Sequence, residues 1–262
     1  MSDTLAEIVI ATRERVALVK HAWGENGIKT EARQAGVARG FAAALDAKRR
    51  EGRPALIAEI KRASPSRGVI RADFDVATLA RAYDDGGATC LSVLTEPRWF
   101  EGASEYVAAA RAAVDLPVLR KDFIVDPWQI GESRALGTDC VLLIVAALSD
   151  DELPALAQQA FAWNMDVLVE AHDEAEVERA VAVEGALIGI NNRDLRTLVV
   201  DPMRALALAR RVPPGRTIVA ESGLKTAADL ARYMAEEIGC FLVGEALMGE
   251  ADVAAATRAL LV

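Results

Sequence analysis

The sequence of 262 residues has few cysteines, few aromatic residues and no long apolar run. Its three cysteines are an odd number and form no C-x-x-C pair, so we expect reduced, buried thiols and no disulfide framework. The longest apolar runs, such as Cys140 to Leu148, fall far short of the ~20 residues that a membrane span needs. Charged residues replace the apolar stretch of a signal peptide at the N-terminus. We therefore expect a cytoplasmic protein with no membrane partner.

Basic residues are outnumbered by acidic ones, and the common cofactor-binding motifs are absent from the sequence. The chain has 30 Lys and Arg against 39 Asp and Glu, a net charge of -9, and this argues against a nucleic-acid partner. The two histidines, His21 and His172, are far apart and form no ligand cluster, so no metal is expected, although His172 follows Glu170 closely. Neither G-x-G-x-x-G nor G-x-x-x-x-G-K-[ST] occurs. The chemistry is therefore predicted to rest on Lys and Glu without a cofactor.

Short apolar runs rich in β-branched residues recur along the chain, and stretches with helical spacing separate them. With 52% hydrophobic residues, the chain can fill one large core. The absence of a long linker or a composition break favours a closed (β/α)8 barrel, the TIM barrel, over an open doubly wound sheet. The eight expected strands are Ala55–Ile60, Cys90–Leu94, Pro117–Leu119, Cys140–Ile144, Val167–Val169, Leu187–Ile190, Thr217–Ala220 and Cys240–Val243.

About fifty residues precede the first expected strand. Leu5, Ile8 and Val16 belong to one amphipathic stripe, and Phe41 and Leu45 to a second. We therefore predict an N-terminal helical extension of two helices over residues 1–50, packed on a single barrel domain over 51–262. Sealing one end of the core is the favoured role of these helices, and contact with a substrate is the alternative.

Ionisable side chains stand at the expected carboxyl ends of several strands, where a barrel of this type binds its reactants. Glu59 and Lys61 are two residues apart in the first strand and share one face. Lys121, Glu170 and Asn191 close or follow later strands in the same way. Each could be the first solvated residue after a buried strand. Together they favour a concave site for acid–base chemistry.

Glycines in the last two units suggest that the ligand carries a phosphate. Gly223 follows the seventh strand and Gly244 the eighth, where backbone N–H groups of this fold hold an anion. The loop 64–71 after the first strand is rich in Ser, Pro and Gly, and it is either a lid or an ordinary surface loop. Phe100 and Phe123 could stack on a ring or pack under a loop.

Six ordered motifs resemble the successive signatures of the indole-3-glycerol phosphate synthase family, and the likeness extends from about Leu56 to Met248. These motifs are Ile57–Ser66, Leu91–Glu96, Leu119–Ile124, Gly189–Leu195, Ala220–Gly223 and Val243–Met248. The resemblance implies a lyase of tryptophan biosynthesis that converts 1-(2-carboxyphenylamino)-1-deoxyribulose 5-phosphate into indole-3-glycerol phosphate, CO2 and water. It implies no cofactor and a small phosphorylated substrate as the partner.

The same resemblance assigns roles to individual residues. Lys121 is similar to the general acid of ring closure, and Glu170 to the acid or base of dehydration. The further catalytic positions it implies are Glu59, Lys61, Asn191 and Ser222. The substrate-binding positions are Ser64, Phe100, Phe123, Leu142, Arg193, Glu221 and Leu242. The phosphate-binding positions are Ser64, Gly223, Gly244 and Glu245.

Two other functions fit the residues and stay open at this point. A Schiff-base aldolase would use Lys121 as a nucleophile and would be trapped by borohydride in the presence of substrate. A barrel that binds a phosphorylated ligand without catalysis would keep the phosphate site alone. For the assembly state we expect a monomer or a weak homo-oligomer.

Overall fold

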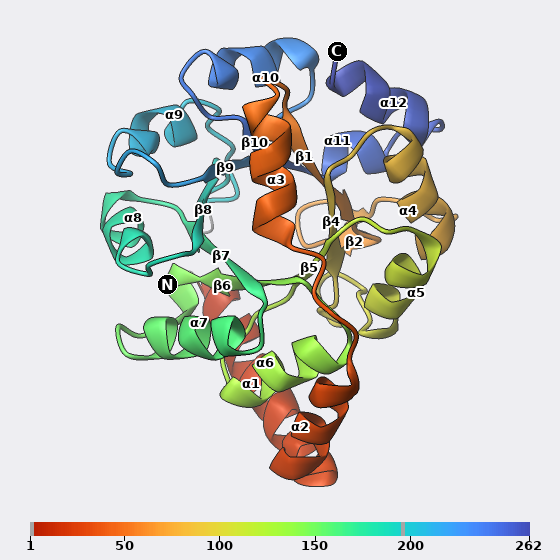
Figure 1. The fold of residues 1–262 in the computed structure, drawn as a ribbon, viewed down its shortest axis with the longest axis vertical. Coiled ribbons are helices and arrows are strands. Elements are labelled where there is room, and N and C mark those ends of the chain that lie inside the picture. Colours follow the sequence, from red (N-terminus) through yellow and green to blue (C-terminus); the bar gives the residue numbers. More distant parts are fainter. Residues whose placement is uncertain (1–2, 195–196) are drawn as a thin grey trace.

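A computed structural model describes residues 3–194 and 197–262 of the chain, so that Leu195, in the fourth of the six motifs, lies outside the described residues. Eight parallel strands form the barrel: β1 (Ala55–Ile60), β4 (Cys90–Leu94), β5 (Val118–Lys121), β6 (Cys140–Ile144), β7 (Asp166–Ala171), β8 (Leu187–Asn191), β9 (Ile218–Glu221) and β10 (Cys240–Val243). They close in the order β1-β10-β9-β8-β7-β6-β5-β4 (Figure 1). The predicted (β/α)8 barrel is confirmed.

Most of the helices surround the barrel on its outer side (Figure 1). The helices are α1 (Asp3–Trp23), α2 (Glu25–Gln34), α3 (Phe41–Arg50), α4 (Val76–Asp85), α5 (Glu105–Ala113), α6 (Pro127–Ala135), α7 (Glu152–Ala162), α8 (Glu174–Val181), α9 (Arg204–Ala209), α10 (Ala227–Met234), α11 (Glu245–Met248) and α12 (Val253–Leu260), with a 3-10 turn η1 (Val145–Ala147). Short polar side chains begin several of them: Asp75 accepts the N–H of Thr78 at 2.7 Å, and Asp126 that of Trp128 at 2.8 Å. None of the described helices is long and apolar enough to cross a membrane.

Several strands continue past their last apolar residue. β5 reaches Lys121, which pairs with Leu94, and β9 reaches Glu221, which pairs with Asn191. The predicted runs stopped one or two residues earlier because the sequence pattern turns polar there. The parallel ladder continues because these polar side chains face the mouth of the barrel and not its packed interior.

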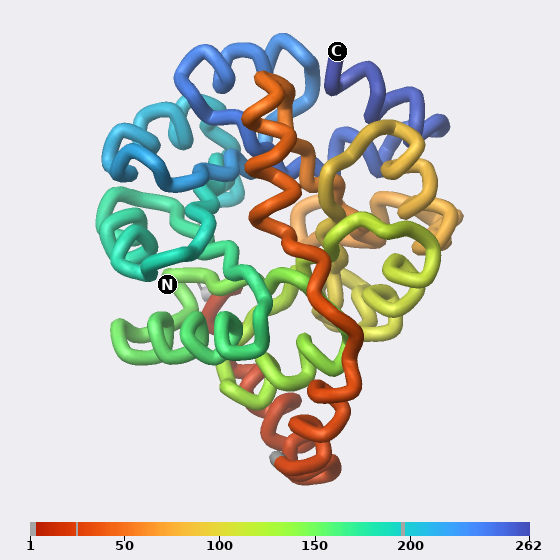
Figure 2. Tube along the Cα trace, viewed as in Figure 1, coloured from red at the N-terminus to blue at the C-terminus, as the bar shows by residue number. Residues whose placement is uncertain are grey.

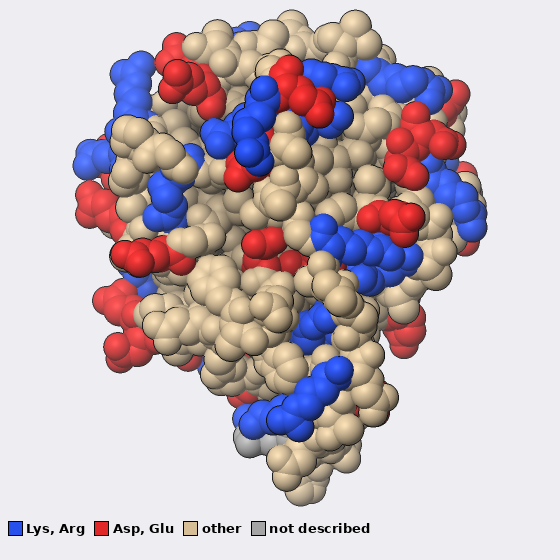
Figure 3. Space-filling model, in the orientation of Figure 1, with Lys and Arg blue, Asp and Glu red and all other residues tan. Residues whose placement is uncertain are grey.

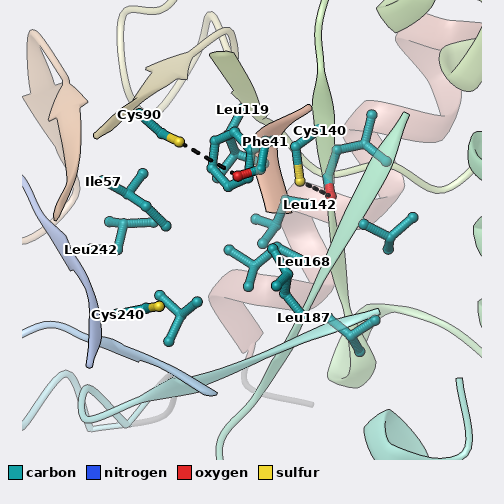
Figure 4. Close-up of a cluster of buried hydrophobic side chains, with 14 of the residues drawn as sticks. Phe41, Ile57, Cys90, Leu119, Cys140, Leu142, Leu168, Leu187, Cys240 and Leu242 are labelled. Atoms are coloured by element: carbon teal, nitrogen blue, oxygen red, sulfur yellow. Dashed lines mark hydrogen bonds between the residues drawn. The ribbon is translucent and has the colours of Figure 1, made fainter. Parts of the chain in front are cut away.

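Apolar side chains from the strands fill the barrel interior (Figure 4). Leu119, Leu168 and Leu242 are buried there. Cys90 and Cys140 are also buried, and each is the first residue of its strand. The three cysteines are free and buried, as expected. The interior is therefore a packed core below the mouth, not a channel.

Helix α3 closes the amino-terminal end of the barrel, and Figure 1 shows it lying across the strands. The Phe41 side chain is fully buried, and its carbonyl oxygen lies 3.7 Å from Cys90 Sγ. The backbone N–H of Ala42 donates to Asp166 at 2.9 Å, at the start of β7. The sealing role expected for the extension is therefore the role of α3.

Helix α1 packs at the opposite end, beside the segments that follow β5 and β6. Arg13 donates to the Val125 carbonyl oxygen at 3.0 Å, and Arg15 lies 3.6 Å from an oxygen of Asp122. Among the described residues of α1, none lines the mouth cavity. The two predicted helices thus occupy opposite ends of the barrel.

The prediction of two N-terminal helices was incomplete, because α2 lies between them. Figure 2 shows α2 beside α6 at the narrow end of the molecule, before the chain runs up to α3. Only Ile28 and Ala32 of α2 are buried hydrophobic residues, and Gly24 and Gly27 interrupt the sequence signal. Two apolar side chains among eight polar or small ones are too few for the sequence pattern to predict a helix there.

Candidate active site

A cavity of about 870 Å³ opens at the carboxyl ends of the barrel strands. Side chains from widely separated parts of the chain meet there because all the parallel strands end on this side. Fifteen of the sixteen predicted site residues line it: Glu59, Lys61, Phe100, Lys121, Phe123, Leu142, Glu170, Asn191, Arg193, Glu221, Ser222, Gly223, Leu242, Gly244 and Glu245. The exception is Ser64, which is buried in β2 (Ala63–Ser64) with its Oγ 3.3 Å from Ser66 Oγ. Ser66 lines the cavity instead.

At the centre of the site one ammonium group lies between two carboxylates. Lys121 Nζ donates to Glu170 Oε2 at 3.1 Å and to Glu221 Oε2 at 3.0 Å. The three side chains come from β5, β7 and β9, and both carboxylates are buried. Buried charges of this kind persist only when paired, so each group depends on the other two.

The pKa values in this group shift in different directions. Burial works to lower the pKa of Lys121, but the carboxylates of Glu170 and Glu221 hold it well above its usual value. Burial works to raise the pKa of Glu170, and the nearby charges of Lys121 and His172 hold it below its usual value. Burial and the charge of Glu170 outweigh Lys121 at Glu221 and raise its pKa to about 8. One carboxylate is ionised and the other is poised to carry a proton.

A second ion pair lies on β1 and just beyond its end. Lys61 Nζ is 2.7 Å from Glu59 Oε1, and both side chains line the cavity, as their two-residue spacing predicts. The Glu59 carboxylate packs against Gly244, where an added Cβ would stand 2.6 Å from Glu59 Oε1. Lys61 and Lys121 outweigh burial and lower the pKa of Glu59. The glycine thus makes room for an ionised carboxylate on the wall.

Asn191 connects the central carboxylate to the loop after β8. Its Nδ2 donates to Glu170 Oε1 at 3.2 Å, and its Oδ1 accepts the backbone N–H of Arg193 at 2.9 Å. The Arg193 guanidinium lies 3.0 Å from Glu245 Oε2, and Arg67 pairs with the other oxygen of Glu245. Two guanidinium groups therefore converge on the start of α11, at one side of the cavity.

The loop that carries Arg67 is not irregular, because a two-stranded antiparallel hairpin, β2 with β3 (Gly68–Val69), forms within it. Ser66 and Arg67 at its tip are exposed and line the cavity. The sequence left a lid and a surface loop open as alternatives, and this single arrangement is compatible with either.

The glycines predicted for an anion site lie at the same side of the cavity. Gly223 has φ +78°, and an added Cβ would stand 2.6 Å from Val200 Cγ1, so only glycine fits there. Ser222 before it also has a positive φ of 66°. Lys225 lines the cavity next to this turn, a cation that the sequence analysis did not single out.

The opposite side of the cavity is apolar. The rings of Phe100 and Phe123 are tilted by 39° with centroids 6.3 Å apart, and both side chains line the cavity. Leu142 of β6 and Leu242 of β10 also line the cavity. The cavity therefore offers an apolar surface, a central acid–base group and a cationic, glycine-rich end.

A buried network behind β5 fixes the strand that carries Lys121. The fully buried Arg120 lies 2.8 Å from Asp122 Oδ2 and 2.7 Å from Glu132 Oε2. Thr95 donates to the same Asp122 oxygen at 2.8 Å. The residues on both sides of Lys121 are therefore held by charge-assisted hydrogen bonds, which are the stronger kind in proteins.

Comparison with known proteins agrees with this arrangement. The sequence profile of the family described as "Indole-3-glycerol phosphate synthase" matches residues 5–260. A protein of that name from Azospirillum brasilense is 55% identical over 100% of both chains. Another, from Rhodospirillum rubrum, is 52% identical over 100% of both chains.

Solved structures with much lower identity share the fold. A 3-hexulose-6-phosphate synthase superposes with a TM-score of 0.62 at 21% identity, over 79% of this chain and 97% of that one. The tryptophan synthase subunit alpha from Legionella pneumophila gives a TM-score of 0.62 at 14% identity, over 86% of this chain and 97% of that one. These likenesses concern the barrel alone. The match over nearly the whole sequence shows more: the chain belongs to the indole-3-glycerol phosphate synthase family, lyases of tryptophan biosynthesis.

Proposed function

We propose that the protein converts 1-(2-carboxyphenylamino)-1-deoxyribulose 5-phosphate into indole-3-glycerol phosphate, CO2 and water. The observation that carries this proposal is the Lys121 ammonium group between Glu170 and Glu221, on the wall of a cavity with one apolar and one cationic side. Ring closure followed by dehydration needs a proton donor and a proton acceptor across one pocket. The family membership supports the same reaction.

The proposed substrate fits the cavity by its chemistry. Its aromatic ring would lie against Phe100 and Phe123, together with Leu142 and Leu242. Its carboxylate would be held by Lys61 or Arg193. Its phosphate would bind at the glycine-rich end, for which the proposed contacts are Ser64, Gly223, Gly244 and the backbone of Glu245. The placement of Ser64 off the cavity wall makes it the weakest member of this set.

In the first step, the ring carbon that bears the carboxylate attacks the ketone carbon, and Lys121 donates a proton to the ketone oxygen. The C–C bond to the carboxylate then breaks, and its electron pair restores the aromatic ring as CO2 departs. In the last step, Glu170 takes a proton from the neighbouring methylene carbon. The new hydroxyl group leaves as water with a proton from the ammonium group of Lys61 or Lys121. Glu59, Asn191 and Ser222 would hold these groups and the intermediates in place.

The aldolase alternative requires Lys121 as a neutral amine, because only the unprotonated amine attacks a carbonyl group. Burial between Glu170 and Glu221 holds the pKa of Lys121 well above its usual value, so the ammonium form dominates. This charge state suits a general acid and opposes a Schiff base. A barrel that only binds a ligand would have no use for a buried cation between two carboxylates.

The test is to mix the purified protein with the proposed substrate and to follow indole fluorescence. Lys121→Ala should lower kcat by about two to four orders of magnitude, the usual contribution of a general acid, while a phosphorylated product analogue still binds. The matched control is Lys48→Ala on α3, at the closed end of the barrel, where Lys48 pairs with Glu51 at 3.6 Å. Full activity of Lys121→Ala, or a borohydride-trapped adduct on Lys121, would refute the acid role.

A further inference from the structure

Lys121 does not by itself distinguish the two carboxylates that flank it. Its Nζ lies 3.1 Å from Glu170 Oε2 and 3.0 Å from Glu221 Oε2, so both pairs have the same length within a tenth of an ångström. Two carboxylates this close to one cation compete for a single proton, and the mechanism needs one of them as the base. The groups around the second oxygen of each carboxylate must therefore make the difference.

Those second oxygens have different surroundings. Glu170 Oε1 receives the amide of Asn191 at 3.2 Å and lies 3.2 Å from Nε2 of His172. Glu221 Oε1 is buried and has no hydrogen-bond donor in the part of the chain that the structure describes. Lys121 is shared by the two carboxylates, so a second positive charge beside Glu170 and none beside Glu221 Oε1 favours the negative charge on Glu170.

His172 is itself fixed by the start of the next helix. It follows the last residue of β7, and Glu176 in the first turn of α8 reaches back to it. Glu176 Oε2 accepts the backbone N–H of His172 at 2.8 Å and lies 3.0 Å from its Nδ1. The side chain of Asp173 in turn accepts the N–H of Glu176 at 2.9 Å. The helix start thus orients the imidazole ring so that Nε2 faces Glu170.

The burial of these side chains shows which of them meet the ligand. His172 has 8% of its side chain exposed and does not line the cavity, whereas Glu170 does. Nε2 meets Glu170 Oε1 as an ion pair without the alignment of a hydrogen bond. His172 therefore touches the reacting carboxylate from behind and cannot itself touch a substrate in the cavity.

We propose that His172, held by Glu176, is a positioning residue for Glu170: its imidazolium fixes the Glu170 carboxylate and keeps the negative charge there and not on Glu221. This assignment rests on the proposed function for its kinetic consequences, but its electrostatic part concerns the resting protein. The charged groups that face His172 are Glu170 from β7 and Glu176 from α8, with Lys121 and Glu221 beyond Glu170. Burial opposes the charge on His172, and these two carboxylates outweigh it and raise its pKa to about 9.

The electrostatic part can be tested without any substrate. The chain has only two histidines, so 15N-histidine labelling gives two ring systems, of which exposed His21 is the internal reference. We expect the His172 signals to remain those of an imidazolium ion at pH 7.5, and to vanish in His172→Gln. Glu176→Gln should lower the midpoint of the His172 titration by more than one pH unit. A neutral His172 at pH 7, or a midpoint unmoved in Glu176→Gln, would overturn the proposal.

The kinetic part compares kcat and KM of His172→Gln and Glu176→Gln with the unmodified protein. We expect kcat about tenfold lower at pH 7, the effect of one pKa unit on the sharing of a proton, with KM unchanged. The kcat ratio should approach one near pH 10, where the imidazole of the unmodified protein has itself lost its charge. A merely structural role would lower activity by the same factor at every pH, and this result would refute positioning.

Two comparisons complete the design. In a Glu170→Gln background, His172→Gln should cause no further loss, because its effect passes through Glu170; an additive loss would contradict this. Glu174→Gln is the matched control, since Glu174 lies in the same helical turn but is exposed and pairs with Arg211. If no variant or parent protein turns over the substrate, the proposed function fails while the titration of His172 still decides the electrostatic claim.

Discussion

At the scale of single residues, the site depends on close packing of charged groups against glycines. Gly244 has room for no side chain, because an added Cβ would lie 2.6 Å from Glu59 Oε1 and 2.9 Å from its Cβ. Its φ is -128°, which is not the left-handed conformation that favours glycine, so it is this close approach to Glu59 that excludes a side chain.

We therefore expect Gly244→Ala to displace the Glu59 carboxylate and to lower the free energy of unfolding by about 1–3 kcal/mol, the usual range for overpacking. kcat/KM should fall as well, because Glu59 moves away from Lys61. Gly249→Ala is the control at the other end of α11, where the nearest atom to an added Cβ is 3.7 Å away. Urea unfolding and steady-state kinetics measure both variants, and equal stability of the two would contradict the steric argument.

A second residue-scale prediction concerns stability against pH. The pKa of His172 is raised from 6.5 to about 9, so its contribution is complete below pH 6.5 and is lost as the pH rises through 9. The shift is worth roughly 3 kcal/mol at most. The raised pKa of Glu221 also makes the protein less stable as the pH rises from 4.5 to about 8. The difference in unfolding free energy between the unmodified protein and His172→Gln therefore isolates the contribution of the histidine. The difference in unfolding free energy between the two proteins should shrink between pH 6.5 and 9.5; a constant difference would be inconsistent with this shift.

The sequence predicted which residues line the cavity where a polar side chain directly follows an apolar run, as for Lys121 and Glu170. It failed where the position depends on a local turn. Ser64 turns inward because it pairs in a short hairpin, which leaves Ser66 at the cavity. The carboxylate that orients His172 is four residues further along, in a helix turn, and no strand pattern signals such a contact.

At the scale of elements, the strands were predictable because each is a nearly continuous apolar run between glycine turns. Helix α2 was not, because its burial rests on Ile28 and Ala32 alone. Ile28 forms a small cluster with Val16 and Trp128 that is separate from the barrel core. We therefore expect the stability of α2 to be local, so that the barrel does not depend on it.

Ile28→Ala should remove about 2–5 kcal/mol of local packing, the range for buried Ile to Ala. Hydrogen exchange of the α2 amides should become faster, while the strands and the indole-forming activity are unchanged. Lys29→Ala, at the next position on the same helix, is the control because Lys29 is exposed. Slower folding or faster exchange throughout the barrel would show that α2 is coupled to the core.

At the scale of the whole molecule, the two ends of the barrel have different tasks. On the face that carries α3, basic and acidic side chains are interspersed (Figure 3). Below this surface the core begins, and the three cysteines lie buried at that depth. Burial raises the pKa of Cys240 to about 12 and also raises the pKa values of Cys90 and Cys140.

The thiols should therefore be inert in the folded protein, because reagents attack the exposed thiolate. We expect a colorimetric disulfide reagent to find no reactive thiol in buffer at pH 8 and all three in concentrated urea. The midpoint of thiol exposure should coincide with the unfolding midpoint measured by circular dichroism. Reaction of one thiol at low urea would reveal local opening at the end that α3 covers.

Inert native thiols leave the protein open to dye attachment without prior removal of its own cysteines. An introduced Ser66→Cys would be the sole reactive position, at the exposed tip of the hairpin and on the rim of the cavity. A fluorophore bound there would change its emission on addition of ligand if the hairpin folds over the mouth, and would stay constant if the hairpin is a fixed part of the surface. Because the three native cysteines are buried at the closed end of the barrel, a single dye can report on movement at the open end.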